Sequence, residues 1–323
     1  MPFDQGGIPG PSRVGVFGAT DLVRLEGAEA VHATPFRPDH DRIVRSGGLV
    51  GEVEACDMAI VCLPRNRIAG LALVAEACQT LSPEGVLIVD GQKTDGIDAA
   101  LKKLRAVLPL TGSAAKAHGK IAWFTRPNPL PPALESWTAA ARPKRTADGY
   151  LTAAGVFSSD GLDPATSMLI EHLPQDAKGT AADFGAGWGA LAGALLTASP
   201  ALESVDLVEA DSLALDLARQ NVTDPRAAFH WADATQWGGG PYDLIVSNPP
   251  FHVARQADPS LGQAFLVAAA ARLRTKGRLM VVANRQLPYE ATLEATFHNW
   301  QVLTSTLHYK ILTATRPRTT RRG

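Results

Sequence analysis

The sequence predicts an α/β protein with two Rossmann-like domains, of which the first is degenerate. In the second half, short apolar runs alternate with helical periods, which indicates a mostly parallel sheet covered by helices on both faces. The first half repeats the same order with a weaker pattern. The chain has 323 residues, enough for two domains of ordinary size.

In the second half, expected strands and helices follow each other until the last stretch. "QVLTSTLHYKILTATRP" (301–317) holds two β-rich runs with no helix between them, which predicts an antiparallel hairpin at the sheet edge. The other expected strands cover 180–185, 204–210, 227–232, 242–248 and 277–284, and the expected helices cover 190–199, 212–222 and 263–273.

The first half contains a segment that matches the second half closely in layout. "CDMAIVCLPRNR" (56–67) and "YDLIVSNPPFHV" (242–253) both run from an aspartate, through an apolar strand, to a proline. Each is followed by an Ala-rich helix and then by a glycine-led apolar strand. We interpret this as an internal duplication. The first-half strands are expected at 13–19, 57–64 and 85–91, and the helices at 68–81 and 96–108.

A Pro-rich and then charge-rich stretch, 126–150, separates the two halves and is typical of a connector. We therefore expect a first domain over 1–135 and a second over 136–323.

The composition is that of a soluble globular protein, with a net charge of −1. No apolar run is long enough to span a membrane, and the N-terminus has no signal-peptide pattern. The three cysteines show no metal-ligand spacing, so we expect no metal and a reducing, cytoplasmic location. Neither half is broadly basic, so nucleic acid would have to bind local patches such as 142–145 and 316–322.

The glycine-rich stretch "ADFGAGWGAL" follows the first strand of the second half and predicts a ligand-binding turn. Gly185, Gly187 and Gly189 allow a tight turn, close approach to a ligand and entry into a helix. Asp183 precedes the first glycine by two residues. Glu209 ends the next strand, where a carboxylate can accept both hydroxyls of a ribose.

Two cofactor classes fit this loop. The glycine spacing with a final alanine matches the dinucleotide fingerprint, while Asp-x-Gly-x-Gly-x-Gly matches the loop of S-adenosylmethionine-dependent methyltransferases. The acid at Asp183 favours the second class, because a carboxylate attracts the positive sulfonium and ammonium of S-adenosylmethionine, whereas a pyrophosphate gains nothing from it. Asp233, at the end of the strand 227–232, is a candidate acceptor for the amine of an adenine.

The motif "IVSNPPF" (245–251) lies at the end of the following strand, on the same rim. Asn248 offers an amide oxygen, and the two prolines fix the direction of their carbonyls. An exocyclic amine can donate one hydrogen to the Asn248 oxygen and one to the Pro249 carbonyl. Phe251, after Pro250, would stack on the ring and hold its plane.

Five stretches together resemble the ribosomal RNA guanine-N2 methyltransferases, whose small-subunit members are slightly more similar to this sequence than the large-subunit ones. The resemblance is strong over 150–315 and faint over 14–130. The stretches are "GVFSSDGLDPATSMLIEHLP", "DFGAGWG", "YDLIVSNPPFH", "VVANRQLPYEATLEATF" and "LHYKILTA".

The resemblance implies two class I methyltransferase-like domains, with a degenerate N-terminal copy that assists RNA binding. It implies S-adenosyl-L-methionine as cofactor, ribosomal RNA or a ribosomal subunit as partner, and a monomer in the cytoplasm without metal or membrane. Trp188 and Phe184 are bulkier than the family pattern leads us to expect. The implied catalytic residues are Asn248, Pro249, Pro250 and Phe251, and the implied cofactor contacts are Phe157, Asp183, Gly185, Gly187, Gly189, Glu209 and Asp233.

The function that these residues favour is methyl transfer to the exocyclic N2 of a guanine in ribosomal RNA. Alternatives are methylation of adenine N6 or of a protein glutamine amide, a non-catalytic RNA-binding assembly factor, and a nicotinamide-dependent oxidoreductase. Phe251 argues against a glutamine enzyme, where tyrosine is commoner, and Asn248 argues against a pure binder. Attack by a cysteine thiolate is excluded for the second half, which contains no cysteine.

Overall fold

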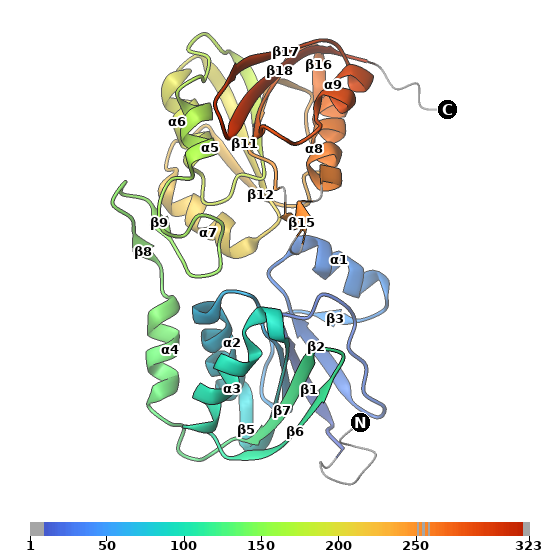
Figure 1. The fold of residues 1–323 in the computed structure, drawn as a ribbon, viewed down its shortest axis with the longest axis vertical. Helices are drawn as coiled ribbons and strands as arrows, with labels where there is room; N and C mark the ends of the chain where they lie inside the picture. The colour runs from blue at the N-terminus through green and yellow to red at the C-terminus, as the bar shows by residue number, and fades with distance from the viewer. Residues whose placement is uncertain (1–9, 251, 254–255, 258, 319–323) are drawn as a thin grey trace. The chain divides into compact units, whose positions relative to one another are not determined.

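A computed structural model describes residues 10–250, 252–253, 256–257 and 259–318. The chain forms two compact units, each an α/β layer structure (Figure 1). Unit 1 consists of Met1–Pro143 with Ala153–Gly155, and unit 2 of Lys144–Thr152 with Val156–Gly323.

Unit 2 contains one large sheet, in the strand order β12-β11-β10-β13-β16-β18-β17. The first five strands run parallel, and β18 and β17 form the expected antiparallel hairpin at the edge. The strands are β10 (Gly179–Phe184), β11 (Leu202–Glu209), β12 (Ala227–Trp231), β13 (Tyr242–Ser247), β16 (Leu273–Asn284), β17 (Phe297–Ser305) and β18 (Tyr309–Pro317).

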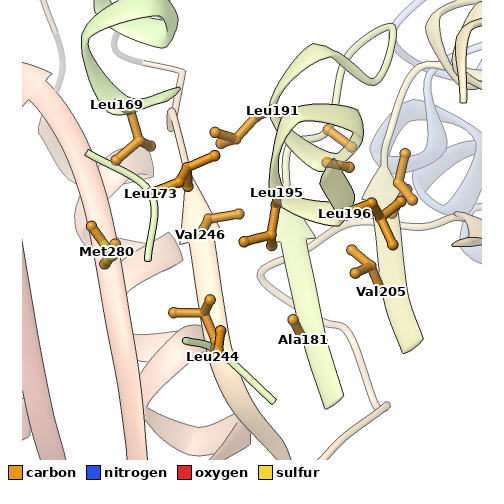
Figure 2. Close-up of a cluster of buried hydrophobic side chains, with 14 of the residues drawn as sticks. Leu169, Leu173, Ala181, Leu191, Leu195, Leu196, Val205, Leu244, Val246 and Met280 are labelled. Atoms are coloured by element: carbon orange, nitrogen blue, oxygen red, sulfur yellow. The ribbon is translucent and has the colours of Figure 1, made fainter. Parts of the chain in front are cut away.

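Helices cover both faces of this sheet. Figure 2 shows the face where Leu169 of α5 and Leu195 of α6 pack on Leu244 and Val246 of β13. On the other face, α8 and α9 contribute Phe265 and Leu293 to a second core cluster. The helices of unit 2 are α5 (Pro164–Ile170), α6 (Ala190–Ala198), α7 (Ser212–Asn221), α8 (Pro259–Arg272) and α9 (Glu290–Thr296), and two short hairpins are formed by β8 (Lys144–Arg145) with β9 (Leu151–Thr152) and by β14 (His252–Val253) with β15 (Gln256–Ala257).

Unit 1 has a sheet of the same design, in the strand order β3-β2-β1-β4-β5-β7-β6. Parallel and antiparallel pairings follow the same order as in unit 2. Its elements are β1 (Arg13–Phe17), β2 (Glu29–Ala33), α1 (Arg37–Arg45), β3 (Leu49–Val50), β4 (Cys56–Cys62), α2 (Arg67–Thr80), β5 (Leu81–Gln92), a 3-10 turn (Lys93–Asp95), α3 (Ile97–Arg105), β6 (Leu110–Lys116), β7 (Gly119–Thr125) and α4 (Ala133–Ala141).

The two sheets also agree in register. Val14 pairs with Met58 in unit 1 as Ala181 pairs with Leu244 in unit 2. The aspartate near the start of each of the two central strands makes the same contact at the equivalent position: Asp57 Oδ1 accepts a hydrogen bond from the Arg13 backbone N–H, and Asp243 Oδ2 accepts one from that of Thr180. This agreement supports an internal duplication.

Several elements of unit 1 were not among those that the sequence predicted, namely β2, α1, β3, β6, β7 and α4. The hairpin β6–β7 carries no readable signal, because β6 is exposed along almost its whole length and shows no alternation. The helix α4 crosses the expected boundary at residue 135, and it lies in unit 1 because it packs against α2. None of the helices that the structure describes is long and apolar enough to cross a membrane.

Candidate functional site

The glycine-rich loop between β10 and α6 turns through three glycines with positive φ angles. Gly185, Gly187 and Gly189 have φ values of 76°, 53° and 90°, in the region that side-chain-bearing residues rarely adopt. A Cβ on Gly187 would meet no atom within 4 Å, whereas one on Gly189 would lie 2.8 Å from Val222. Gly187 therefore leaves space for a ligand, and Gly189 allows α6 to pack against the end of α7.

Glu209, at the end of β11, holds this loop in place. Its Oε2 accepts a hydrogen bond from the Gly187 backbone N–H at 2.7 Å, and its Oε1 accepts one from Asp211 N–H at 2.8 Å. Burial raises the pKa of Glu209 above its ordinary value. A carboxylate has about four acceptor positions, so Glu209 keeps capacity for hydroxyl donors of a ligand.

Asp183, near the end of β10, is a buried carboxyl group without a partner. Its side chain is fully buried, and neither oxygen makes a hydrogen bond of good geometry to the described residues, although, against the larger effect of burial, the backbone N–H of Ala192 is near enough to lower the pKa a little. Burial, reinforced by the negative charge of Glu209, raises the pKa of Asp183 to about 8. A carboxyl group without a partner is unfavourable in a folded core, so its place in the cavity lining indicates a cationic ligand.

Asn248, directly after β13, is oriented by two residues of another segment. Its Nδ2 donates hydrogen bonds to Asp163 Oδ2 at 3.1 Å and to Thr166 Oγ1 at 2.8 Å. An ionised carboxylate only accepts, so the amide nitrogen must face Asp163. The Oδ1 atom makes no hydrogen bond to the described residues and is the acceptor that Asn248 offers to a ligand.

Asp163 owes its position to the start of α5. It is the N-cap residue, and its Oδ2 also accepts a hydrogen bond from Thr166 N–H at 2.9 Å. The same carboxylate oxygen thus begins the helix and fixes the Asn248 amide. Asp163 and Thr166 were not among the residues that the sequence predicted, because "LDPAT" indicates a helix N-cap but says nothing of a contact 85 residues away.

Trp188 links the glycine-rich loop to the segment before α5. Its Nε1–H donates a hydrogen bond to the Phe157 carbonyl oxygen at 3.0 Å, and its ring lies 4.8 Å from that of Tyr150. This hydrogen bond explains why a residue as large as tryptophan stands at position 188. Its side chain holds the turn that contains Phe157 next to the glycine-rich loop. Phe184, the other bulky residue, lies fully buried in the core behind the loop.

The cavity brings together five of the eleven predicted residues, including Gly185. Asp183, Gly187, Phe157 and Asn248 line it, together with the newly identified Asp163. The full lining is Phe157, Ser158, Asp163, Thr166, Asp183, Gly185, Ala186, Gly187, Trp188, Ala190, Leu191 and Asn248.

Five of the predicted residues that the structure describes do not line this cavity. Gly189 follows the lining residue Trp188, and Glu209 binds the lining residue Gly187 through its backbone N–H, but neither belongs to the lining itself. Asp233 does not line this cavity: its Oδ1 accepts hydrogen bonds from Thr235 N–H and Oγ1–H at 2.8 and 2.7 Å, although the neighbouring Ala232 N–H bonds to the Glu209 carbonyl on the same rim. Pro249 is buried and Pro250 is exposed. Phe251 lies outside the residues that the structure describes. No group of three or more His, Cys, Asp or Glu side chains in the described ranges is arranged to hold a metal.

Comparison with known proteins gives consistent results. The family model for the methyltransferase small domain matches residues 149–313. The chain is 34% identical to the ribosomal RNA small subunit methyltransferase C of Shewanella halifaxensis over 264 residues, which is 80% of this chain and 77% of the relative. The enzyme of the same name from Shewanella piezotolerans is also 34% identical, over 80% of this chain and 77% of its own length.

A solved structure resembles the whole two-unit chain. It is the T. thermophilus 16S rRNA N2 G1207 methyltransferase (RsmC), solved in complex with AdoMet and guanosine. The TM-score is 0.79 at 25% sequence identity, and the alignment covers 96% of this chain and 89% of that one. The predicted fold, with two methyltransferase-like domains, is confirmed.

Proposed function

The chain belongs to the ribosomal RNA small subunit methyltransferase C family, and from this premise we propose that it methylates one guanine of small-subunit ribosomal RNA. It is an S-adenosylmethionine-dependent enzyme that transfers the methyl group to the exocyclic N2 amine. By the name of its T. thermophilus relative, the target is the guanine that corresponds to position 1207 of 16S rRNA. The observation that carries the assignment is the fixed amide of Asn248 beside the partnerless carboxyl group of Asp183.

The cavity fits the cofactor by its chemistry. Asp183 offers a buried negative charge to the ammonium end of the molecule, and Glu209 offers acceptors for the ribose hydroxyls. The space above Gly187 lets the ligand approach the backbone, and Phe157 lies at the mouth of the cavity. When bound, S-adenosylmethionine supplies an electrophilic methyl group on a sulfonium. Asp233 stays a proposed contact to the adenine amine, on the same rim.

The residues of the NPPF motif position the amine. The Asn248 Oδ1 accepts one N–H of the guanine amine and the Pro249 carbonyl accepts the other, which orients the nitrogen lone pair toward the methyl group. Asp163 and Thr166 act as positioning residues, because they stop the Asn248 amide from rotating. Phe251 stacks on the base. No strong base is required, since the amine loses its proton only as the new bond forms.

We also propose the cellular setting from the nature of the substrate. Ribosomal RNA as the substrate and the three free cysteines both fit the cytoplasm. We expect a monomer that needs neither metal nor membrane. Unit 1 serves RNA binding and not transfer. Gel filtration with light scattering tests the monomer, and activity in the presence of EDTA tests the independence from metal.

The decisive experiment is the mapping of modified nucleotides. Small ribosomal subunits from a strain that lacks this gene are incubated with the purified protein and S-adenosylmethionine, and digested RNA is analysed by mass spectrometry. The expected product is N2-methylguanosine at one position. Methyl groups on adenine or on a ribosomal protein, or none at all, would overturn the proposal.

A further inference from the structure

The hairpin between β17 and β18 carries a very exposed apolar side chain at its tip. Leu307 is 83% exposed, more than any other large apolar side chain among the described residues. A leucine in water at the tip of a loop contributes nothing to the core of unit 2. A single exposed apolar side chain is common on protein surfaces, so it is the position of Leu307 in the fold that suggests a role.

The tip lies on the same rim of the sheet as the candidate site. Tyr309 pairs with Asn284 at the carboxyl end of β16, and Arg285 N–H donates a hydrogen bond to the His308 carbonyl at 2.8 Å. The strand β16 is the direct neighbour of β13, which ends one residue before Asn248. The strand β18, which starts at the tip, is two strands away from β13 in the sheet, so the tip and the site are about 10 Å apart across the strands. One RNA strand lying on this rim can contact both.

The tip is held firmly by its own hydrogen bonds. Thr306 N–H donates to the Tyr309 carbonyl at 2.8 Å, and Thr306 Oγ1 accepts from Tyr309 N–H at 3.0 Å and His308 N–H at 3.3 Å. Arg285 Nη1 donates to the Thr306 carbonyl at 3.4 Å, which places an exposed cation beside the leucine. The apolar side chain of Leu307 can pack against the face of a base, and the neighbouring cation of Arg285 can bind a phosphate, so together they suit an RNA strand.

Unit 1 shows that the fold does not require this leucine. The equivalent tip joins β6 and β7, and there Lys93 N–H donates to the His118 carbonyl at 3.0 Å, as Arg285 does to His308. Gln92 pairs with Gly119 as Asn284 pairs with Tyr309, so Leu307 corresponds to Ala117. The two tips share their architecture, and only the one beside Asn248 carries a large apolar side chain.

We propose that Leu307 is an RNA-contacting wedge that packs against a base next to the target guanine, while Arg285 binds the adjacent phosphate. The proposal rests on the proposed function. A base within a stacked strand presents its amine to an enzyme only after leaving the stack, and an inserted apolar side chain compensates its neighbour for the lost stacking. Leu307 is placed to do this because it stands on the rim where the strand must pass.

Two experiments test the wedge. In the first, single-turnover methylation of unmodified small subunits is measured for the wild type, Leu307→Ser, Leu307→Met and Val302→Ser, a matched exposed apolar site on the same hairpin. We expect Leu307→Ser to lower kcat/KM about tenfold. Leu307→Met and Val302→Ser should stay within about twofold of the wild type, and all four proteins should bind S-adenosylhomocysteine equally.

The second experiment identifies what the tip touches. A photo-crosslinking amino acid at position 307 should attach to RNA within a few nucleotides of the target guanine, whereas the same group at position 302 should not. Crosslinks to a ribosomal protein, crosslinks to distant RNA, or none would overturn the wedge, as would wild-type rates for Leu307→Ser. A wild type that fails to methylate small subunits would instead refute the proposed function itself.

Discussion

Unit 1 and unit 2 share a sheet of the same strand order and register, but the acidic and amide side chains at the carboxyl ends of the unit 2 strands have no counterpart at the equivalent described positions of unit 1. The glycine that begins the turn is present in both: Gly18 N–H bonds to the Ala33 carbonyl as Gly185 N–H bonds to that of Val208. Aligned on the strand registers, the site residues of unit 2 are replaced in unit 1, with Val16 for Asp183, Thr20 for Gly187, Thr34 for Glu209 and Cys62 for Asn248.

The comparison distinguishes residues that stabilise the fold, which both units keep, from residues that we assign to the reaction, which unit 2 alone keeps among the described residues. The strand-starting aspartates, Asp57 and Asp243, persist in both units because they bind backbone N–H groups. Among the described residues, the acidic and amide groups persist only in unit 2, where Asp183 and Asn248 line the cavity and Glu209 binds the backbone of Gly187 in its lining. Cys62 has its pKa raised to about 11, by burial and by the charge of Asp90, so it is no thiolate nucleophile.

The largest effect is expected at Asn248. Asn248→Ala removes the acceptor that holds the amine, so we expect methyl transfer to fall by at least about a thousandfold. Binding of S-adenosylhomocysteine, measured by calorimetry, should stay within about threefold of the wild type. The matched control is Cys62→Ala in unit 1, which should leave both quantities unchanged. Substantial transfer by Asn248→Ala would refute the assigned role.

The second effect concerns Asp183 and pH. In the protein without ligand, Asp183 with its pKa of about 8 is largely protonated at pH 7, and a bound ammonium favours the ionised form. Cofactor affinity should therefore rise by up to about tenfold per pH unit between pH 6 and 8, then level off. Calorimetry in buffers of different ionisation enthalpy should detect the released proton. Asp183→Asn should bind the cofactor weakly and with no such pH dependence.

The same raised pKa affects stability in a defined direction. A carboxyl group whose pKa is higher in the folded state stabilises the fold at low pH, and this contribution is lost as pH rises from about 4 through about 8. Without ligand, Asp183→Asn should therefore be more stable than the wild type at pH 8, by about 2 kcal/mol. The free energy of unfolding of both proteins is measured by urea denaturation at pH 8. Equal values for the wild type and Asp183→Asn would show that the Asp183 carboxyl group either has a partner or is not buried.

A smaller effect is expected at Thr166. Thr166→Val keeps the shape but removes the oxygen that accepts from Asn248 Nδ2. We expect kcat to fall about tenfold, with the affinity for S-adenosylhomocysteine and the melting temperature nearly unchanged. A loss of cofactor affinity in place of kcat would contradict a role in orienting Asn248. Thr20→Val in unit 1 is the control and should have no effect on either quantity.

The smallest effect is expected at Trp188. Trp188→Phe retains an aromatic ring beside Tyr150 but loses the hydrogen bond to the Phe157 carbonyl. Because the turn with Phe157 is then less firmly placed, the dissociation constant for S-adenosylhomocysteine should rise about threefold to tenfold. An unchanged constant would mean that Phe157 does not depend on this bond for its position.

The sequence predicts the parts of the site that are encoded locally. Asp183 and Glu209 lie at the ends of strands, and Gly187 and Asn248 follow strands, in motifs that can be read within a few residues; parallel strands bring these ends to one rim. Two hydrogen bonds of the site cannot be predicted from local motifs: the one from Asn248 to Asp163 and the one from Trp188 to Phe157. Each joins segments that are distant in the chain.

Asp233 illustrates the opposite problem. An aspartate after a strand is typical both of a ligand contact and of a turn, and in the structure its carboxylate bonds to Thr235 within the turn. The duplication is recognisable from two matching strand ends, but only the registers show that it extends to every strand of the sheet.

The most direct test of the comparison between the units is the number of cofactor sites. Titration of the full chain with S-adenosylhomocysteine should give one site per chain, which Asp183→Asn weakens strongly and Val16→Ala, at the equivalent position of unit 1, leaves unchanged. Two sites per chain, or a single site that responds to Val16→Ala and not to Asp183→Asn, would contradict the claim that only unit 2 retains the chemistry.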